Sequence, residues 1–126
     1  MKTLLLIAVV LVLSIEPLHA ATASWYSSGS VKKEGTCKAD RCYTASGKEI
    51  HELERMGRLF AASNEHKIGA KLRVCSERNG KCVVVEVLDR GGFKKYGRSL
   101  DLCEKAFGQI AQTRQGLAEV SIRRIA

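Results

Sequence analysis

Asp89 is the residue whose place in the sequence most suggests chemistry. It follows the apolar stretch VVVEVL, residues 83–88, and is followed by Arg90 and two glycines. The two-residue period and the many valines predict a buried strand, so Asp89 is expected where this strand leaves the core. A carboxylate at that point either caps a tight turn or is held at the rim of a cleft, where it could act on a bound substrate.

Cysteine pairs are a second feature with chemical meaning, because five cysteines in so short a chain are typical of an exported protein with disulfide bonds. Cys75 and Cys82 flank the segment SERNGK, in which Asn79 and Gly80 form a strong hairpin signal. We therefore predict that Cys75 and Cys82 face each other across neighbouring strands and form one disulfide.

The other three cysteines leave alternatives open. Cys37 and Cys42 enclose the polar segment KADR and can pair locally, but either can instead reach Cys103. Neither a paired CxxC motif nor a histidine spacing completes a zinc site, so we expect disulfides and no metal. No cofactor is expected either.

The elements that must position these residues are mostly strands. Short runs rich in β-branched residues alternate with turns that contain glycine. We expect six strands, at Ser24–Ser27, Leu59–Ala62, Lys71–Cys75, Cys82–Leu88, Ser99–Leu102 and Leu117–Ile125. Strands this short favour a small barrel, because closure removes their exposed edges.

One helix is expected late in the chain. Asp101 and Glu104 have capping-box spacing and precede an apolar stripe within residues 106–111, which predicts a short helix with Asp101 as its cap. The segment HELERMG, residues 51–57, can add a helical turn. The stretch rich in Gly, Ser and Lys before Tyr43 is expected to be a loop.

The N-terminal segment has the build of a secretory signal peptide. Lys2 precedes the run LLLIAVVLVL, and Pro17 and the small-residue exit LHA follow it. The run is too short for a comfortable membrane span, and no nearby cysteine offers a lipid anchor. We expect cleavage after Ala20, or a little later after ATA, and one domain at residues 21–126 of a secreted or periplasmic monomer without a stable membrane anchor.

The charge of the chain indicates its partners. The formal net charge is +8 and the pI is near 9.5, which favours anionic partners such as cell-wall polymers, acidic polysaccharides or phospholipid surfaces. No nucleic-acid partner is expected, because no recognised binding motif accompanies the charge. The excess of lysine and arginine can also serve solubility alone.

A family resemblance rests on an ordered set of motifs. They are ASWY (23–26), YTASGKE (43–49), FAAS (60–63), IGAKLRV (68–74), NGKCVVVEVLDRGGF (79–93) and GRSLDLCEKAF (97–107). Together they span nearly all of the expected mature chain, which resembles the rare lipoprotein A (RlpA-like) family. The most specific part is LDRGGF followed closely by GRSLDL.

This resemblance implies a fold and a class of function. The RlpA-like family and the related amino-terminal domain of expansins have a six-stranded double-psi β-barrel with a polysaccharide-binding groove. The implied partner is a cell-wall glycan such as peptidoglycan, and catalytic members are lytic transglycosylases, which leave an anhydro sugar end. A non-catalytic, expansin-like wall-binding protein is the alternative, and an exported protease inhibitor on the same barrel is a third.

The resemblance also implies site residues. Asp89 matches the groove aspartate of the family, in a reaction where one carboxyl group protonates the leaving oxygen and a second steadies the positive charge on the sugar. Catalytic members carry Glu where this chain has Lys48 and His where it has Ser63. Glu49 is the first candidate for a displaced acid. Further candidates are Glu52 and Glu54 for the acid, and His51 and His66 for the missing imidazole.

Sugar contacts are expected from residues in or beside these motifs. Tyr43 and Thr44 lie beside the expected groove and offer hydroxyl groups, and Ser63 is a further expected substrate-binding residue. Trp25 and Tyr26 can stack on sugar rings or pack a barrel end. Arg90 can bind a carboxylate of the ligand or pair with an acidic side chain of the protein, either Asp101 or Glu86.

Overall fold

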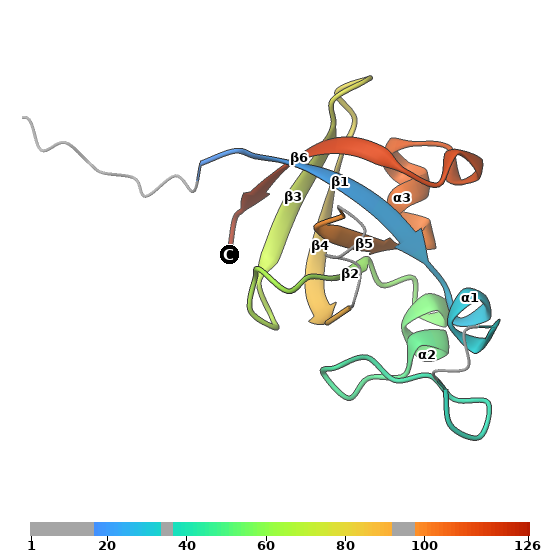
Figure 1. Ribbon diagram of the computed structural model, residues 1–126. Helices are drawn as coiled ribbons and strands as arrows, with labels where there is room; N and C mark the ends of the chain where they lie inside the picture. Colours follow the sequence, from blue (N-terminus) through green and yellow to red (C-terminus); the bar gives the residue numbers. More distant parts are fainter. Residues whose placement is uncertain (1–16, 34–36, 92–97) are drawn as a thin grey trace, which may run out of the picture.

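The fold is a closed β-barrel (Figure 1). The computed structural model describes residues 17–33, 37–91 and 98–126. The strands are β1 (His19–Tyr26), β2 (Phe60–Ala62), β3 (Lys71–Ser76), β4 (Cys82–Asp89), β5 (Leu100–Cys103) and β6 (Ala118–Arg124). They close in the order β1-β5-β2-β4-β3-β6, so the predicted six-stranded, mainly β barrel is confirmed.

Two parallel pairings connect strands that are far apart in sequence. β1 runs parallel to β5 and β2 runs parallel to β4, whereas the β1–β6, β2–β5, β3–β4 and β3–β6 pairs are antiparallel. Every strand therefore has a neighbour on both sides. For the six described strands, closure pairs both edges and so protects them from pairing with another chain.

The core follows from the alternation of side chains along the strands. In β3, Leu72 and Val74 are fully buried, whereas the alternate residues Lys71 and Arg73 are exposed. The inward-facing residues of all six strands build one hydrophobic core, closed at one end by Phe107 and its neighbours in the late helix. The valine-rich stretch before Asp89 is thus a barrel strand, as its pattern predicts.

The first strand begins earlier than expected. The sequence predicts a strand at 24–27, but β1 already starts at His19 and pairs with β6 from His19↔Ile122 to Ala23↔Ala118. The segment HAATA has small residues with little strand preference, so the pairing with β6 decides its conformation. The expected signal peptide, residues 1–20, lies largely outside the described residues, and only its last two residues belong to β1.

The described part of the chain has more helix than the single one predicted. The expected late helix is confirmed as α3 (Glu104–Ile110), and the helical turn in HELERMG is confirmed as α2 (Ile50–Arg55). A third helix, α1 (Ser28–Lys33), lies in the predicted loop, and a 3-10 turn, η2 (Thr113–Gln115), follows α3. In the described ranges no helix is long and apolar enough to cross a membrane.

The predicted role of Asp101 as a helix cap is wrong. β5 continues to Cys103, which occupies the N-cap position of α3 and makes no side-chain cap hydrogen bond. Asp101 lies within β5 and accepts a hydrogen bond from Ser24 Oγ at 2.9 Å. The spacing to Glu104 was misleading because the strand runs directly into the helix and leaves Asp101 in extended backbone.

Two disulfides join the cysteines. Cys75 and Cys82 are directly opposed across β3 and β4 and form the predicted bond. The local pair Cys37–Cys42 forms the second, which resolves the alternatives left by the sequence. Cys103 is a free thiol, and burial raises its pKa.

Candidate functional site

The position of Asp89 is set by an irregularity in β4. Val83, Val85 and Val87 face the core, so strict alternation would turn residue 89 inward as well. Instead the register with β2 shifts: Ala61 pairs with Val87, but Ala62 pairs with Asp89. The extra residue, Leu88, is also buried, and Asp89 emerges half-buried at the end of the strand. Such a bulge re-aims the side chain that follows it.

Three donors hold the Asp89 carboxylate. Its Oδ1 accepts hydrogen bonds from the backbone N–H groups of Ala45 and Arg90, both at 2.8 Å. Its Oδ2 accepts a hydrogen bond from Tyr26 Oη at 3.0 Å. Donors of this kind fix the plane of the carboxylate, so Asp89 is held in one orientation toward a bound ligand.

Tyr26 contributes its hydroxyl group to this site. Its side chain is 8% exposed, and its ring packs edge-on against Phe60 with centroids 5.8 Å apart. Burial, followed by the nearby charge of Asp89, raises the pKa of the phenol far above its ordinary value, so Tyr26 remains a hydrogen-bond donor. The buried ring leaves almost no surface on which a sugar could stack.

Trp25 lies on the other face of β1, because successive side chains of a strand point in opposite directions. It is half-buried, packs against the core, and its Nε1 donates a hydrogen bond to the carbonyl oxygen of Thr113 at 2.8 Å. Trp25 and Tyr26 therefore do not form one platform. Trp25 fastens β1 to the turn that follows α3.

The segment from Tyr43 to Glu49 is a compact loop against the end of β4. Tyr43 and Glu49 form an isolated bridge at its base, and the Ser46 N–H donates to the Leu88 carbonyl oxygen at 3.0 Å. Thr44 is buried, and its Oγ1 is bonded to Ser46 Oγ at 2.7 Å. Because Ala45 donates to Asp89, the TASG motif and the DRG motif meet in space as the sequence predicts for one site.

Within this loop Tyr43 and Glu49 both act on Arg41, because a side-chain hydrogen bond with Tyr43 and the nearby charge of Glu49 raise the pKa of that arginine. Tyr43 is 54% exposed beside the site. Glu49 precedes α2, and its carboxylate makes no cap hydrogen bond to the helix. The internal bonds of the loop instead involve backbone groups, Thr44 and Ser46.

The other two candidate acids are engaged elsewhere. Glu52 forms an ion pair with Arg55 at 2.7 Å, one turn along α2. Glu54 accepts a hydrogen bond from the backbone N–H of Ser28 at 3.3 Å. Of the three, only Glu49 belongs to the loop that contacts Asp89.

Ser63 occupies the family's histidine position but serves the turn after β2. It is 1% exposed, and its Oγ accepts the backbone N–H groups of Glu65 and His66, both at 3.2 Å. Its own N–H donates to the carbonyl oxygen of Asp89 at 3.0 Å. Ser63 therefore lies next to Asp89 along the backbone while its buried hydroxyl bonds within its own turn. His51 is exposed on α2, and His66 is half-buried in the Ser63 turn.

Arg90 binds backbone carbonyl groups. Its guanidinium donates to the carbonyl oxygens of Ser63 and His66, the second at 2.7 Å. The two acidic residues expected as partners of Arg90 are bonded to other residues. Glu86 pairs with Arg58 at 3.1 Å, and Asp101 accepts a hydrogen bond from Ser24. Arg90 thus ties the end of β4 to the turn after β2. The DRGGF motif continues into residues 92 and 93, which lie outside the described residues.

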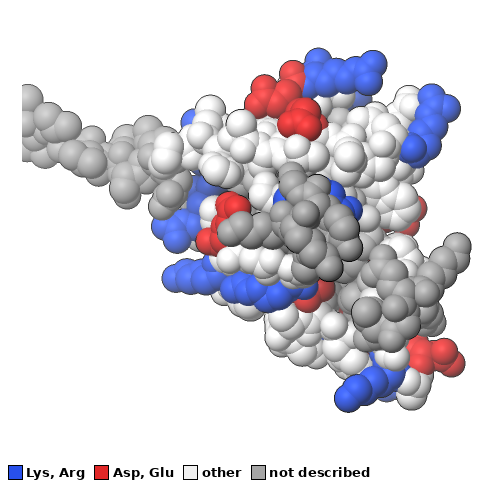
Figure 2. Space-filling model, in the orientation of Figure 1, with Lys and Arg blue, Asp and Glu red and all other residues white. Residues whose placement is uncertain are grey.

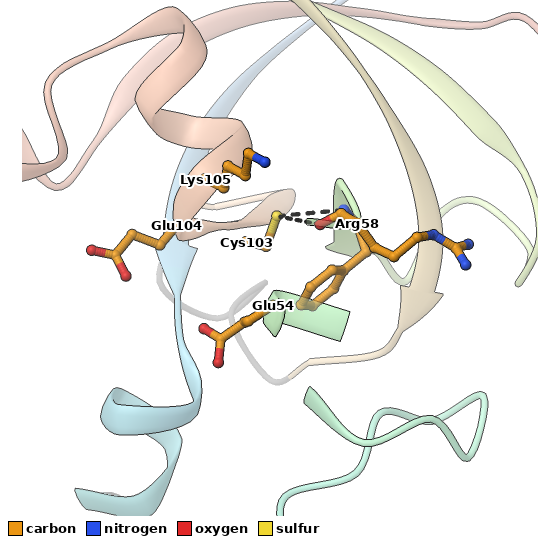
Figure 3. A pocket seen from close by; sticks show the side chains of 6 residues that line it. Glu54, Arg58, Cys103, Glu104 and Lys105 are labelled. Atoms are coloured by element: carbon orange, nitrogen blue, oxygen red, sulfur yellow. Dashed lines mark hydrogen bonds between the residues drawn. The ribbon is translucent and has the colours of Figure 1, made fainter. Parts of the chain in front are cut away.

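A small cavity is lined in part by Phe60. It has a volume of about 210 Å³, and Figure 3 shows the residues that line it, Glu54, Arg58, Phe60, Cys103, Glu104 and Lys105. Cys103 Sγ accepts the Phe60 N–H at 3.4 Å and is shielded there, while the Arg58 guanidinium extends away toward Glu86. Asp89 and the loop at 43–49 do not line this cavity. Over residues 17–33, 37–91 and 98–126, no three His, Cys, Asp or Glu side chains gather to hold a metal ion.

The family model for lytic transglycolases matches residues 19–122, which is most of the chain. The chain belongs to this family. It is an RlpA-like double-psi β-barrel, as the ordered motifs and the closed six-stranded barrel indicate.

Relatives at the sequence level carry the same designation. An endolytic peptidoglycan transglycosylase RlpA of Rickettsia bellii is 34% identical over 100 residues, which covers 79% of this chain and 39% of the relative. A probable RlpA of Synechocystis is 29% identical, and the matched region covers 86% of this chain and 30% of the Synechocystis protein. An uncharacterized Synechocystis protein is 44% identical over 69 residues, which cover 55% of this chain and 71% of that protein. The chain thus spans well under half of the RlpA proteins that it matches.

Solved structures share the fold. The expansin of Clavibacter michiganensis, in a mutant form in complex with cellohexaose, aligns with a TM-score of 0.61 at 19% identity over 87% of this chain and 51% of the expansin. A Streptomyces papain inhibitor aligns with a TM-score of 0.62 at 17% identity over 89% of this chain and 97% of the inhibitor. The same barrel is therefore found in proteins with different named functions.

Sequence reasoning missed some groups at the site. It did not foresee the Ala45 N–H as a donor to Asp89 or the phenol of Tyr26 as a second one. It also missed Asn64, whose side-chain amide bonds both the N–H and the carbonyl oxygen of Gly91 just beyond Asp89. A backbone donor leaves no mark of its own in a sequence, and Asn64 lies in a polar turn where such residues are common.

Proposed function

We propose that the protein is exported, binds cell-wall glycan strands beside Asp89, and cleaves peptidoglycan as an RlpA-type lytic transglycosylase. The observation that carries this proposal is the Asp89 carboxylate, which the β4 bulge brings to the surface and three donors hold in one orientation. The membership in the lytic transglycolase family supports the reaction class. Cleavage of a signal peptide after Ala20 and a monomeric state belong to the same proposal.

The proposed roles divide two tasks between two carboxyl groups. Glu49, the acid of the neighbouring loop, protonates the glycosidic oxygen as its bond to the sugar carbon breaks. The ionised Asp89 stabilises the positive charge that develops on the sugar ring. The 6-hydroxyl group of that sugar then bonds to the same carbon and returns its proton to Glu49. No water is consumed, and the product carries an anhydro end.

Surrounding residues position the glycan in this proposal. Tyr43, the exposed aromatic residue beside Asp89, contacts sugar through its ring and hydroxyl group. Arg90 and Ser63 position Asp89, because their hydrogen bonds join the end of β4 to the turn after β2. Thr44 shapes the loop that carries Glu49.

A second candidate function has its own support. Ser63 replaces the histidine of the catalytic members and uses its hydroxyl in a turn, so no imidazole stands at that position. A protein with Asp89 but without that histidine would bind glycan and cleave nothing, in the manner of an expansin-like wall-binding protein. A secreted protease inhibitor on the same barrel shares only the fold at 17% identity and has no specific feature here.

The test uses the mature protein and purified glycan strands with and without stem peptides. Mass spectrometry should detect anhydro-ended fragments with the wild type, and Asp89→Asn should reduce their release by about two to three orders of magnitude while the protein stays folded. Glu49→Gln should reduce release similarly. The matched control is Asp40→Asn, the same change in an exposed loop, which should keep full activity.

The outcomes separate the two candidates. Wild-type protein that binds the strands but releases no anhydro ends would support the non-catalytic function, and Asp89→Asn should then alter affinity alone. Full activity of Asp89→Asn would remove this residue from the mechanism. An active protein that is indifferent to Glu49→Gln would require another acid.

A further inference from the structure

The outer face of β3 and β6 carries two arginines in direct opposition. Arg73 of β3 and Arg123 of β6 are cross-strand partners, and both belong to the outward-facing set of their strands. Like charges placed opposite each other on neighbouring strands are unfavourable. Lys71, two residues before Arg73 on the same face, adds a third positive charge.

The described residues offer these charges little compensation. The ion pairs among them involve other residues, and Glu86, the cross-strand partner of Lys71, bonds to Arg58. Arg123 Nε is buried yet has no hydrogen-bond partner. Arg73 has only a 3.9 Å contact with the Cys82 sulfur. Where the terminal nitrogens of a guanidinium group are reachable, they can bind a carboxylate, and arginine favours such pairs.

The shape and composition of this face suit an extended polymer. Val84 of β4 is the other cross-strand partner of Arg73 and is 45% exposed, so the row Val84, Arg73 and Arg123 crosses three strands. Such a row is about 10 Å wide, comparable to a disaccharide. On the side of the barrel where β6 and the C-terminus lie in Figure 1, Figure 2 shows Lys and Arg side chains together with some Asp or Glu side chains.

We propose that this face, defined by Lys71, Arg73, Val84 and Arg123, binds an acidic polysaccharide whose sugar rings carry carboxylates. The arginines would pair with the carboxylates, and Val84 would contact the apolar side of a ring. Val84 is the one apolar member of this set of four, and binding to a phospholipid surface is an outcome that the test below distinguishes. The proposal concerns residues other than Asp89 and Glu49, so it does not depend on glycan cleavage.

The experiment measures binding of the full-length mature protein to soluble polygalacturonate at low ionic strength. Wild type should bind, and neutral dextran of similar length should not. Arg73→Gln/Arg123→Gln should bind about tenfold more weakly or worse, on the scale of one lost charge-assisted hydrogen bond. The matched control is Lys38→Gln/Arg114→Gln, which removes the same charge from exposed positions elsewhere and should change binding less than twofold.

Added salt and alternative ligands complete the test. Binding should fall steeply toward 1 M salt, where the screening length is only about 3 Å. An equal loss in both double variants would overturn the proposal in favour of diffuse net charge. Tighter binding of phosphatidylglycerol vesicles or duplex DNA through the same arginines would overturn the assigned ligand. Because the substitutions remove two opposed charges, the double variant should be at least as stable as wild type. The single Arg73→Gln and Arg123→Gln variants allow the same comparison of binding with wild type.

Discussion

Removal of the Tyr26 hydroxyl group is the sharpest test of how the Asp89 carboxylate is held. Tyr26→Phe keeps the ring against Phe60 and deletes only the donor to Asp89 Oδ2. A hydrogen bond to a charged acceptor contributes about 1.5–3 kcal/mol net. Asp89 keeps its two backbone donors, so we expect a loss near the lower end, about 1.5 kcal/mol at pH 8.

The same phenol gives this difference a pH dependence whose sign follows from its raised pKa. In the unfolded chain a tyrosine ionises near pH 10, whereas in the folded protein burial and the charge of Asp89 keep Tyr26 protonated. Above pH 10 the unfolded state therefore binds fewer protons than the folded state, and stability falls as the pH rises. At pH 11 wild type should have lost about 1.4 kcal/mol for this reason.

Tyr26→Phe has no phenol at this position and escapes that loss. The free energy of unfolding should therefore favour wild type by about 1.5 kcal/mol at pH 8, and the two proteins should become nearly equal at pH 11. The buried thiol of Cys103, whose pKa is also raised, adds to the alkaline loss in both proteins and cancels in the comparison.

Urea unfolding followed by circular dichroism at the two pH values measures both quantities. A difference between the proteins that stays constant from pH 8 to pH 11 would refute the reasoning, because it would mean that Tyr26 ionises freely in the folded state. A variant as stable as wild type at pH 8 would show that the hydrogen bond to Asp89 contributes nothing.

Two further predictions concern the disulfide of the hairpin and the N-terminus. Cys75→Ser/Cys82→Ser should lower the free energy of unfolding by about 2–3 kcal/mol in denaturant titrations, the usual scale for a short closed loop, and an unchanged midpoint would contradict this. Mass spectrometry of exported protein should find an N-terminus at Ala21, since cleavage after Ala23 would remove a fully buried residue that pairs with both β5 and β6. Material that starts at Ser24 would count against the described register of β1.

Much of the barrel could be predicted because its strands carry their own signals. The alternation in β3 and β4 and the Asn79-Gly80 turn are local features, and the structure repeats them almost residue for residue. The start of β1 could not be predicted, because its small residues become a strand only through pairing with β6. The expected cap at Asp101 failed for a related reason, since β5 extends to the helix through its partners β1 and β2.

The candidate site was predictable in its members more than in its geometry. The family motifs brought attention to Asp89 and the 43–49 loop, and the two do meet. The alternation of Val83, Val85 and Val87 does not predict that Leu88 is also buried, because the bulge depends on the register with β2. The part played by Tyr26 likewise depends on a contact across 63 residues of sequence.

The place of β1 between β5 and β6 has a consequence for how the chain folds. Its contacts with β5 join residues 77 positions apart, as in the Ser24–Asp101 hydrogen bond, and its contacts with β6 join residues that are still further apart, as in the Ala23↔Ala118 pair. Closing such long loops costs entropy before any contact rewards it, which makes folding slow. The barrel cannot close until β6 is available, so a chain that still lacks β6 during its synthesis has no complete barrel. The strand order thus makes closure of the barrel depend on its sixth strand, however early the other five are synthesised.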